Sequence, residues 1–389
     1  MTRPIPRRQA PLSLRLNAMA RVGFRMMFYD RLKFVGTVSG VVFAVVLAVQ
    51  QFAILLGLLE KNTMFVEHAG ADLWITPPNT QLLQPGEKLG EQLLMRARTT
   101  PGVEAAEPLI FTAGTVKKPN GGAEPVTLIG TQLPSMLGGP WNLVAGDTRA
   151  LGQPNTMIFE DSEREKYNGL NLNSVRELNG YQIRAGGFTW GLLPFGPAYC
   201  FGDIDLVRAM TATPGNRMNF VLIKAHTGQD LGRLQAAVQA RVPEGLVLQR
   251  TAFEHSIVVN LLKQQLGLSF GISTSFGLAI GFIIVALAMF SSVLDSLREF
   301  GTLKAIGCTN GDLTMLLLVQ SIAYALIGSF VGLGLVTRVA AGIRNPKLVP
   351  IIPQVVIGVV PIVMLFLCVL ASLLALQRIR KLEPATVFR

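Results

Sequence analysis

Charged residues are scarce in this sequence. Asp, Glu, Lys and Arg make up 15% of the 389 residues, whereas hydrophobic residues make up 50%. About a quarter of the residues of an ordinary soluble domain are charged, so the composition favours a membrane protein. The net charge of +11 is concentrated at the two ends of the chain, and the segment from Asn62 to Leu266 is nearly neutral. This distribution argues against nucleic-acid binding, which requires a basic surface.

The residue groups of common catalytic sites are also missing. The three histidines, His68, His226 and His255, lie far apart and lack the spacing of metal ligands, so no zinc site is predicted. Neither GxSxG nor GxxxxGK[ST] occurs, which excludes a nucleophile elbow and a phosphate-binding P-loop. We therefore expect no catalytic site, metal or cofactor in this chain. If the protein uses ATP, a partner subunit must bind the ATP and Mg.

Cysteine is rare as well, with three in the whole chain. Cys308 and Cys368 fall in segments that are predicted below to be cytoplasmic and membrane-embedded. This leaves Cys200 alone in the large middle segment, where no internal disulfide can form. A hydrophobic core must therefore hold that segment together, and its length of about 200 residues is sufficient for one.

Four long runs contain no charged residue and no histidine: 34–59, 266–294, 313–337 and 348–377. Each is longer than the roughly 20 residues that a helix needs to cross the hydrocarbon core of a membrane. The sequence therefore predicts four transmembrane helices. The first run begins at residue 34 and has no small-residue cleavage site after it, which indicates an uncleaved anchor and not a signal peptide.

Basic residues predict the orientation of these spans. Eight Lys and Arg residues precede the first run, against the single acid Asp30, and the tail 378–389 is also basic. The positive-inside rule places both ends in the cytoplasm and residues 60–265 outside. Residues 12–33 mix Leu, Met and Phe with Arg, which suits a helix in the headgroup region. The alternative is a charged flank, within the segment 1–33, that forms no defined helix.

The segment 60–265 is predicted to be an external α/β domain. Its outer parts, about 62–133 and 216–255, read as strand and helix units and form a platform. The middle part, about 134–215, is richer in Gly and Pro and reads as an inserted, mostly β lobe. The platform elements are predicted as strands at 71–77, 218–225 and 245–250, helices at 87–99 and 228–242, and a hairpin of 103–116 and 124–133 around "KKPNGG".

A short charged stretch, 295–312, separates the second and third apolar runs, and a loop at 338–347 separates the third and fourth. Within "SLREFGTLKAIGCTNGDL", the spacing of apolar residues predicts a short amphipathic helix along the membrane, which Gly307 ends. Its stripe consists of Leu297, Phe300, Leu303 and Ile306. Glu299 lies off this stripe, and Gly301 lacks a side chain, so a partner is expected to approach its backbone closely. The alternative is a tight turn that only connects two spans.

The run from Arg298 to Leu335 resembles the signature of FtsX/MacB-type permeases. That signature has an R-E-[IF]-G-x-[LM]-[KR]-A-[ILM]-G core, a short polar turn and a third span rich in Leu, Glu or Gln, and Gly. The matching residues are Arg298, Glu299, Phe300, Gly301, Leu303, Lys304, Ala305, Ile306 and Gly307. The ending "RIRKLEPATVFR" and the order of one span, a large external domain and three spans are also similar. Length and the stretch "ADLWITP" make the chain most similar to DevC-type subunits, which lack a fused ATPase.

The resemblance implies a permease subunit of an ATP-driven ABC exporter of the mechanotransmission type in a bacterial inner (plasma) membrane. It implies that 298–307 is a coupling helix that docks on a separate cytoplasmic ABC ATPase. The other implied partners are a second permease copy in a homodimer, membrane lipids and a periplasmic membrane-fusion protein, and the implied cargo is lipidic or hydrophobic. Uncharged spans offer no ion pathway, which agrees with ATP as the energy source.

Two other functions remain open at this point. A non-transporting permease could regulate a cell-wall hydrolase, although such relatives carry smaller external domains. A membrane-anchored enzyme would need a catalytic grouping, and the sequence has none. A neighbouring gene for a membrane-fusion protein would favour export, and one for a peptidoglycan hydrolase would favour signalling.

Small and amide residues in the spans are predicted to pack helices together. Gly328 and Gly332 form a GxxxG pattern with Gly334 nearby, and Gln50 and Gln51 lie in the first span. Close helix approach explains the glycines, and interhelical hydrogen bonds explain the amides, either within one chain or at a dimer seam.

Overall fold

The structure is a computed structural model that describes residues 12–84, 86–193, 196–263, 265–295, 297–306, 308–342 and 354–380. It divides into two compact units. The helical unit comprises Met1–Leu55, Ser269–Ile343 and Pro350–Arg389, and the α/β unit comprises Leu56–Leu268 and Arg344–Val349. Gly307 and parts of the predicted loop 338–347, of the tail 378–389 and of the N-terminal segment 1–33 lie outside the described residues.

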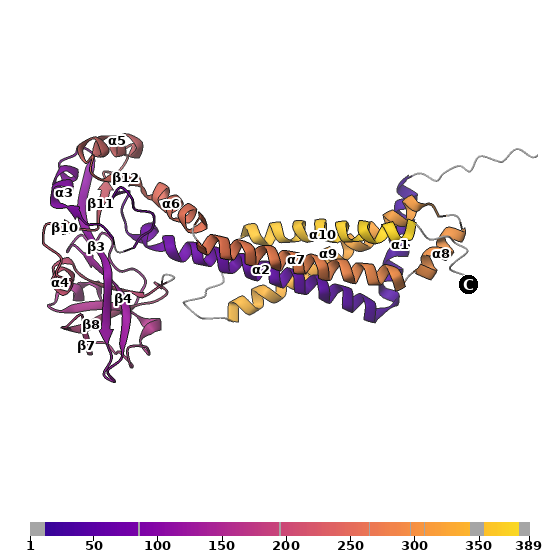
Figure 1. The fold of residues 1–389 in the computed structure, drawn as a ribbon, viewed down its shortest axis with the longest axis horizontal. Helices are drawn as coiled ribbons and strands as arrows, with labels where there is room; N and C mark the ends of the chain where they lie inside the picture. Colours follow the sequence, from indigo (N-terminus) through magenta and orange to yellow (C-terminus); the bar gives the residue numbers. More distant parts are fainter. Residues whose placement is uncertain are drawn as a thin grey trace, which may run out of the picture. The chain divides into compact units, whose positions relative to one another are not determined.

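Five long helices and the short helix α8 are described in the helical unit (Figure 1). They are α1 (Leu12–Tyr29), α2 (Arg31–His68, whose last part belongs to the α/β unit), α7 (Gln265–Asp295), α8 (Leu297–Ile306), α9 (Asn310–Gly342) and α10 (Gln354–Arg380). Within the described ranges, three stretches are long and apolar enough to cross a membrane: Arg31–His68, Asn310–Ala340 and Gln354–Leu374. The second predicted span coincides with α7, whose described apolar stretch, Gly271–Leu287, is shorter. A fourth span therefore stays a prediction.

Asp30 separates α1 from α2. Its Oδ1 accepts hydrogen bonds from the backbone N–H groups of Leu32 (3.1 Å) and Lys33 (3.2 Å), which have no partner inside the new helix. The bond from the Lys33 backbone holds the pKa of Asp30 below its usual value. The helix predicted at 12–33 is thus present, but as α1 followed by a capped break and the start of α2.

A ten-stranded sheet is the centre of the α/β unit, and β3 and β4 lie side by side in Figure 1. The strand order is β12-β1-β11-β3-β4-β9-β6-β8-β5, with β7 against β3 and β8. Two pairs, β4–β9 and β6–β8, are parallel. The strands are β1 (Leu73–Thr76), β3 (Val103–Lys117), β4 (Ala123–Thr131), β5 (Leu143–Gly146), β6 (Thr156–Glu160), β7 (Val175–Leu178), β8 (Tyr181–Thr189), β9 (Ala198–Asp203), β11 (Phe220–Ala225) and β12 (Leu246–Gln249).

Short helices and a second, small strand pair complete this unit. The pair consists of β2 (Leu89–Gly90) and β10 (Arg217–Met218). The helices are α3 (Glu91–Arg98), α4 (Ile204–Met210), α5 (Leu231–Arg241) and α6 (Arg250–Lys263), with 3-10 turns at Thr148–Gly152 and Asp161–Glu163. An α/β domain is thus confirmed, and the strands, helices and hairpin predicted for the platform are all present.

The predicted lobe does not form a sheet of its own. Strands β5 to β9, which lie within 134–215, extend the sheet that the platform strands begin. The join is the parallel pair β4–β9, whose register runs from Val126 opposite Ala198 to Thr131 opposite Asp203. Platform and lobe therefore share one hydrogen-bonded sheet, and the cluster of buried apolar side chains in the lobe also includes Ile110 and Val116 of β3 and Val126 and Leu128 of β4.

Candidate functional site

The apolar side of α8 is buried against other helices of its unit. Phe300 is 1% exposed and belongs to a cluster that we call the α8 anchor. The cluster contains Val293, Phe300, Leu313, Leu316 and Leu317, with Met19, Val22, Met26 and Leu303 packed against it. These residues come from α7, α8, α9 and α1, and Figure 1 shows α8 and α1 at the same end of the helical unit. The short helix is thus fastened to longer helices.

The opposite side of α8 is exposed. Arg298, Glu299, Thr302 and Ala305 are exposed, and Lys304 is partly buried. Ile306 is 82% exposed, so its predicted place in the apolar stripe is wrong. The reason is geometric: at about 100° per residue, positions nine apart, such as 297 and 306, face opposite sides of a helix. α8 therefore presents a mixed charged and apolar surface.

Gly301 lies next to the α8 anchor and is buried by the chain itself. The expectation that a partner could approach its backbone closely is therefore wrong. Because Gly301 is buried, a larger residue there would disturb the packing of α8 as well as any docking.

Backbone capping fixes the turn from α8 into α9. The Cys308 N–H donates to the Leu303 carbonyl (3.0 Å), a bond typical of a closed helix C-terminus. Thr309 and Asp312 then form a capping box. Asp312 Oδ2 accepts from the Thr309 N–H (2.9 Å) and Oγ1 (2.7 Å), and Thr309 Oγ1 is 3.3 Å from the Asp312 N. Residues 308–312 are thus held to the end of α8 and the start of α9 by specific hydrogen bonds.

The N-terminal helix α1 crosses α9 closely. The buried amide of Gln320 donates from Nε2 to the Gly23 carbonyl (3.2 Å). A Cβ on Gly23 would lie 3.6 Å from Gln320 Cγ and from the Leu316 carbonyl oxygen, so the helix backbones meet in van der Waals contact. α1 therefore belongs to the packed helical unit. It packs against α9, the helix against which Phe300 of α8 also packs.

The GxxxG glycines of α9 face α2 of the same chain. A Cβ on Gly328 would lie 2.4 Å from Val41 Cγ1, and one on Gly332 would lie 2.7 Å from Val45 Cγ1. Real Cβ atoms do not approach so closely, so each valine occupies the space that a glycine leaves. Packing within the chain accounts for both glycines. Gly334, by contrast, is exposed with nothing near its Cβ position.

The two amides of the first span have different surroundings. Gln50 is exposed, and Gln51 is partly buried with its Cγ 3.5 Å from the Cβ position of Gly277 on α7. Among the described residues, neither amide has a hydrogen-bond partner, so the predicted interhelical bonds are not observed. A dimer seam that includes Gln50 and Gly334 stays a prediction.

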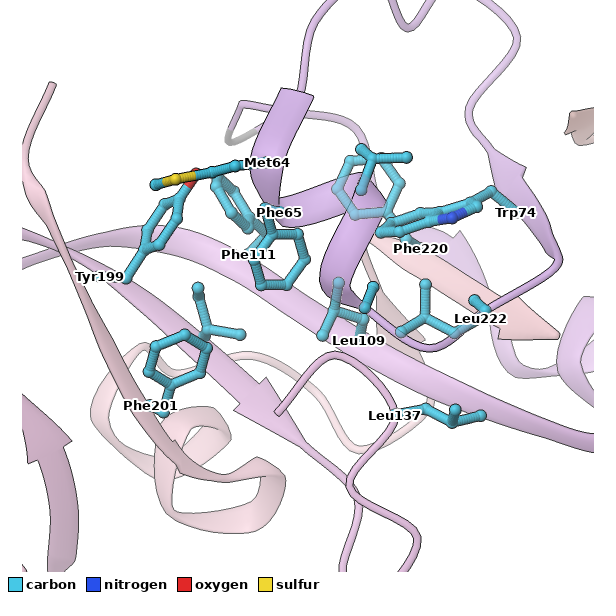
Figure 2. Packing of buried hydrophobic residues seen from close by; sticks show 14 of the residues in the cluster. Met64, Phe65, Trp74, Leu109, Phe111, Leu137, Tyr199, Phe201, Phe220 and Leu222 are labelled. Atoms are coloured by element: carbon cyan, nitrogen blue, oxygen red, sulfur yellow. The ribbon is translucent and has the colours of Figure 1, made fainter. Parts of the chain in front are cut away.

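The last part of α2 enters the core of the α/β unit through Phe65, a contact that the sequence interpretation missed. Phe65 is fully buried, and Figure 2 shows it beside Phe111 and Tyr199. The ring centroids around it are those of Tyr199 (5.5 Å), Phe111 (5.7 Å), Trp141 (6.0 Å), Trp74 (6.3 Å) and Phe201 (6.5 Å). We call this group the aromatic socket. It holds α2 against strands β1, β3 and β9 by large apolar burial and ring contacts.

Lys61 makes a second contact from the same part of α2. Its Nζ donates to the carbonyl oxygen of Gly191 (2.6 Å), which lies in the loop between β8 and β9. Gly191 is in turn held by the buried carboxylate of Glu160, whose Oε1 accepts from the Gly191 N–H (2.7 Å). Burial raises the pKa of Glu160, while hydrogen bonds to its carboxylate act in the opposite direction.

No group of three or more His, Cys, Asp and Glu side chains that could hold a metal occurs in the part of the chain that the structure describes. Cys200 is buried without a disulfide, as predicted. Trp74 and Phe188 are core residues, whereas Trp190 is 38% exposed. The candidate functional residues are those of α8, of the α8 anchor and of the aromatic socket.

Comparison with known proteins finds one matching family model and several similar solved structures. Residues 271–384 match the family described as FtsX-like permease C-terminal. No curated protein matches the chain in sequence. The extracellular domain of the noncanonic ABC-type transporter YknZ from Gram-positive bacteria aligns at 14% identity and TM-score 0.36, over 46% of this chain and 99% of that one. The periplasmic region of MacB from Actinobacillus actinomycetemcomitans aligns at 11% identity and TM-score 0.38, over 50% and 97%.

Proposed function

Because residues 271–384 match the family described as FtsX-like permease C-terminal, we propose that this chain is the membrane subunit of an ABC exporter that works by mechanotransmission. A separate cytoplasmic ATPase binds ATP and Mg and moves α8, and two permease copies form a homodimer. As in DevC-type systems, a periplasmic membrane-fusion protein receives the lipidic or hydrophobic cargo. The chain crosses a bacterial inner membrane four times with both ends in the cytoplasm.

The observation that carries this proposal is the two-sided character of α8. Phe300 fastens one side to the α8 anchor, while Arg298 and Glu299 are exposed on the other. A partner that binds the exposed side of α8 can displace it only together with the helices packed against Phe300. Close-packed interiors transmit such displacement. The capping box between Thr309 and Asp312 holds the connection to α9 by hydrogen bonds.

A continuous series of contacts leads from α8 to α2. α8 contacts α9 through Phe300, and α9 contacts α2 where Gly328 and Gly332 meet valines. α2 has 38 residues and is therefore roughly 57 Å long, well beyond the ~30 Å of the hydrocarbon core. Its last part ends in the aromatic socket. In this proposal, ATP-driven displacement of α8 reaches the external domain through α9 and α2.

The experiment compares one charge reversal at two exposed glutamates. Glu299→Lys is placed on α8, and the matched control Glu165→Lys is placed in the turn that follows Asp161–Glu163 in the α/β unit. Tagged full-length permease is purified from its native cells, and we measure how much ATPase co-purifies and its turnover in lipid nanodiscs. Because a charge of the wrong sign at a docking surface is strongly unfavourable, Glu299→Lys should reduce co-purification about tenfold or more.

The control should leave both co-purification and turnover unchanged. The proposal is wrong if Glu299→Lys behaves like Glu165→Lys, or if the permease alone hydrolyses ATP. Gly301→Leu is unsuitable for this purpose because Gly301 is buried within the chain. An exposed residue on α8 separates docking from folding, since surface changes usually alter stability by no more than about 0.5 kcal/mol.

A further inference from the structure

Lys61 joins α2 to a loop that is far away in the sequence. It lies four residues, about one helical turn, before Phe65, and its Nζ donates to the Gly191 carbonyl (2.6 Å), 130 residues further along the chain. Gly191 belongs to the β8–β9 loop, whose described part consists of residues 190–193 and 196–197. Both strands are in the lobe, and both are on the far side of β4 from the platform. The contact therefore connects α2 with the lobe without passing through the aromatic socket.

The loop itself is held in place by Glu160 at the end of β6. This fully buried carboxylate accepts four hydrogen bonds, and burial of a carboxylate is tolerable only when it is so bonded. The donors are the Gly191 N–H (2.7 Å), the Thr189 hydroxyl (2.9 Å), the Ser162 hydroxyl (3.0 Å) and the Leu192 N–H (3.2 Å). With the amide of Gly191 fixed in this way, its carbonyl is presented to the ammonium of Lys61.

Charge acts on Lys61 in two directions. Burial lowers the pKa of its ammonium, and the attraction of the Glu160 carboxylate acts in the opposite direction and favours the charged form. Lys61 is partly buried, so solvent screens this attraction less than it would on the surface. The hydrogen bond of a charged donor to Gly191 and the attraction to Glu160 thus act on the same side chain.

We propose that Lys61 is a positioning residue that fastens α2 to the loop of residues 189–193, so that displacement of α2 reaches the lobe directly. This inference rests on the proposed function for the origin of the displacement. The aromatic socket holds α2 by burial, which has no preferred direction. Lys61 adds a directional bond, and the lobe then follows both translation and rotation of α2.

The first test asks whether Lys61 holds the loop in the full-length chain. In lipid nanodiscs, hydrogen exchange of the Gly191 and Leu192 amides is measured in wild type, Lys61→Met and Lys61→Arg. Lys61→Met keeps the apolar stem but loses the donor, so exchange should become on the order of tenfold faster, as expected for one lost bond of a charged donor. Lys61→Arg keeps a donor and should restore slow exchange.

Lys117→Met is the matched control, since Lys117 is an exposed lysine of the same unit that pairs with Glu177. It should leave the loop unchanged. The inference is overturned if Lys61→Met leaves the loop amides as slow as in wild type. It is also overturned if exchange rises throughout the sheet, because Lys61 would then stabilise the domain without positioning this loop.

The second test adds the ATPase that co-purifies with the permease. Loop exchange is compared between the nucleotide-free and the vanadate-trapped complex. Wild type should show a difference between the two states, and Lys61→Met should lose it while it still binds the ATPase and stimulates its turnover. A wild-type loop that is indifferent to nucleotide overturns the inference. A chain that binds no ATPase overturns the proposed function, and the first test still decides whether Lys61 holds the loop.

Discussion

α2 packs in opposite ways in the two units to which it belongs. In the helical unit its neighbours are small: Val41 fills the space left by Gly328, and Ala44 lies 3.1 Å from the Cβ position of Gly281. In the α/β unit its Phe65 is surrounded by the five rings of the aromatic socket. α2 therefore packs by close approach to glycines in the helical unit and by burial of a large aromatic ring in the α/β unit.

The difference reflects the solvent that each unit is expected to face. In a bilayer, burial of apolar surface gains nothing over contact with lipid tails, so helices associate by close van der Waals packing at glycines. In water, burial of large rings is the dominant favourable contribution. Hence the same helix should respond to different kinds of substitution on its two parts. Two predictions test this difference on α2, and a third compares a buried cysteine of the α/β unit with a partly exposed cysteine of the helical unit.

The largest effect is expected at the aromatic socket. Phe65→Ala removes a fully buried ring and leaves a cavity that the neighbouring rings cannot fill, so the free energy of unfolding of the α/β unit should fall by about 3–5 kcal/mol. The measurement is unfolding of the full-length chain in denaturant, followed by tryptophan fluorescence, because Trp74 lies against Phe65.

Leu172→Ala is the control for this prediction, since Leu172 is 44% exposed in the same unit. It should change the free energy of unfolding by no more than about 0.5 kcal/mol. Equal effects of the two substitutions would show that the socket does not hold α2, and the comparison between the two parts of the helix would fail.

A smaller effect is expected where α9 meets α2. Gly328→Val would place a Cβ 2.4 Å from Val41 Cγ1 and force the helices apart, at a cost of about 1–3 kcal/mol, as is typical of overpacking. Gly334→Val on the same helix has nothing within 4 Å of its Cβ and should cost little. The measurement is the apparent melting temperature of each variant in nanodiscs.

The pair sharpens the comparison because the two variants make the same chemical change six residues apart. If Gly334→Val is the more harmful of the two, or if it alone abolishes dimers, then the GxxxG face is not the important packing surface. The predicted dimer seam at Gly334 would in that case outweigh packing within the chain.

The platform elements could be predicted from the sequence because their signals are local. The hairpin β3–β4 has β-rich runs on both sides of a Gly- and Pro-containing turn, and α5 has helical periodicity. The parallel pairs β4–β9 and β6–β8 could not be predicted, since they join segments far apart in the sequence and leave no periodic signal. The lobe therefore appeared separate, although it continues the sheet.

The candidate site was predicted in outline but not in orientation. A helix at 298–307 followed from its residues. However, side chains at every third position shift around the helix axis, because three residues do not complete a full turn, and Ile306 is therefore exposed. Thr309 and Asp312 are a capping-box signal that is visible in the sequence. Phe65, by contrast, follows a long apolar run, and only its contacts with residues as distant as Tyr199 reveal its role.

The smallest effect concerns thiol chemistry and leaves stability unchanged. Cys200 is fully buried in the α/β unit, and burial raises the pKa of its thiol well above the ordinary value. Since the thiolate is the reactive form, Cys200 should resist N-ethylmaleimide in the folded chain at neutral pH. Cys308 lies in the partly exposed turn between α8 and α9 and should react. Peptide mass spectrometry after labelling measures both, and labelling in denaturant shows that Cys200 can react once exposed.

A membrane-impermeant maleimide added to intact cells should leave Cys308 unlabelled, because the turn is predicted to be cytoplasmic, whereas a cysteine in place of Asn120 should react. Reaction of Cys200 in the folded chain would mean that the core of the α/β unit admits water, and the expected difference in reactivity between the buried Cys200 and the partly exposed Cys308 would be lost.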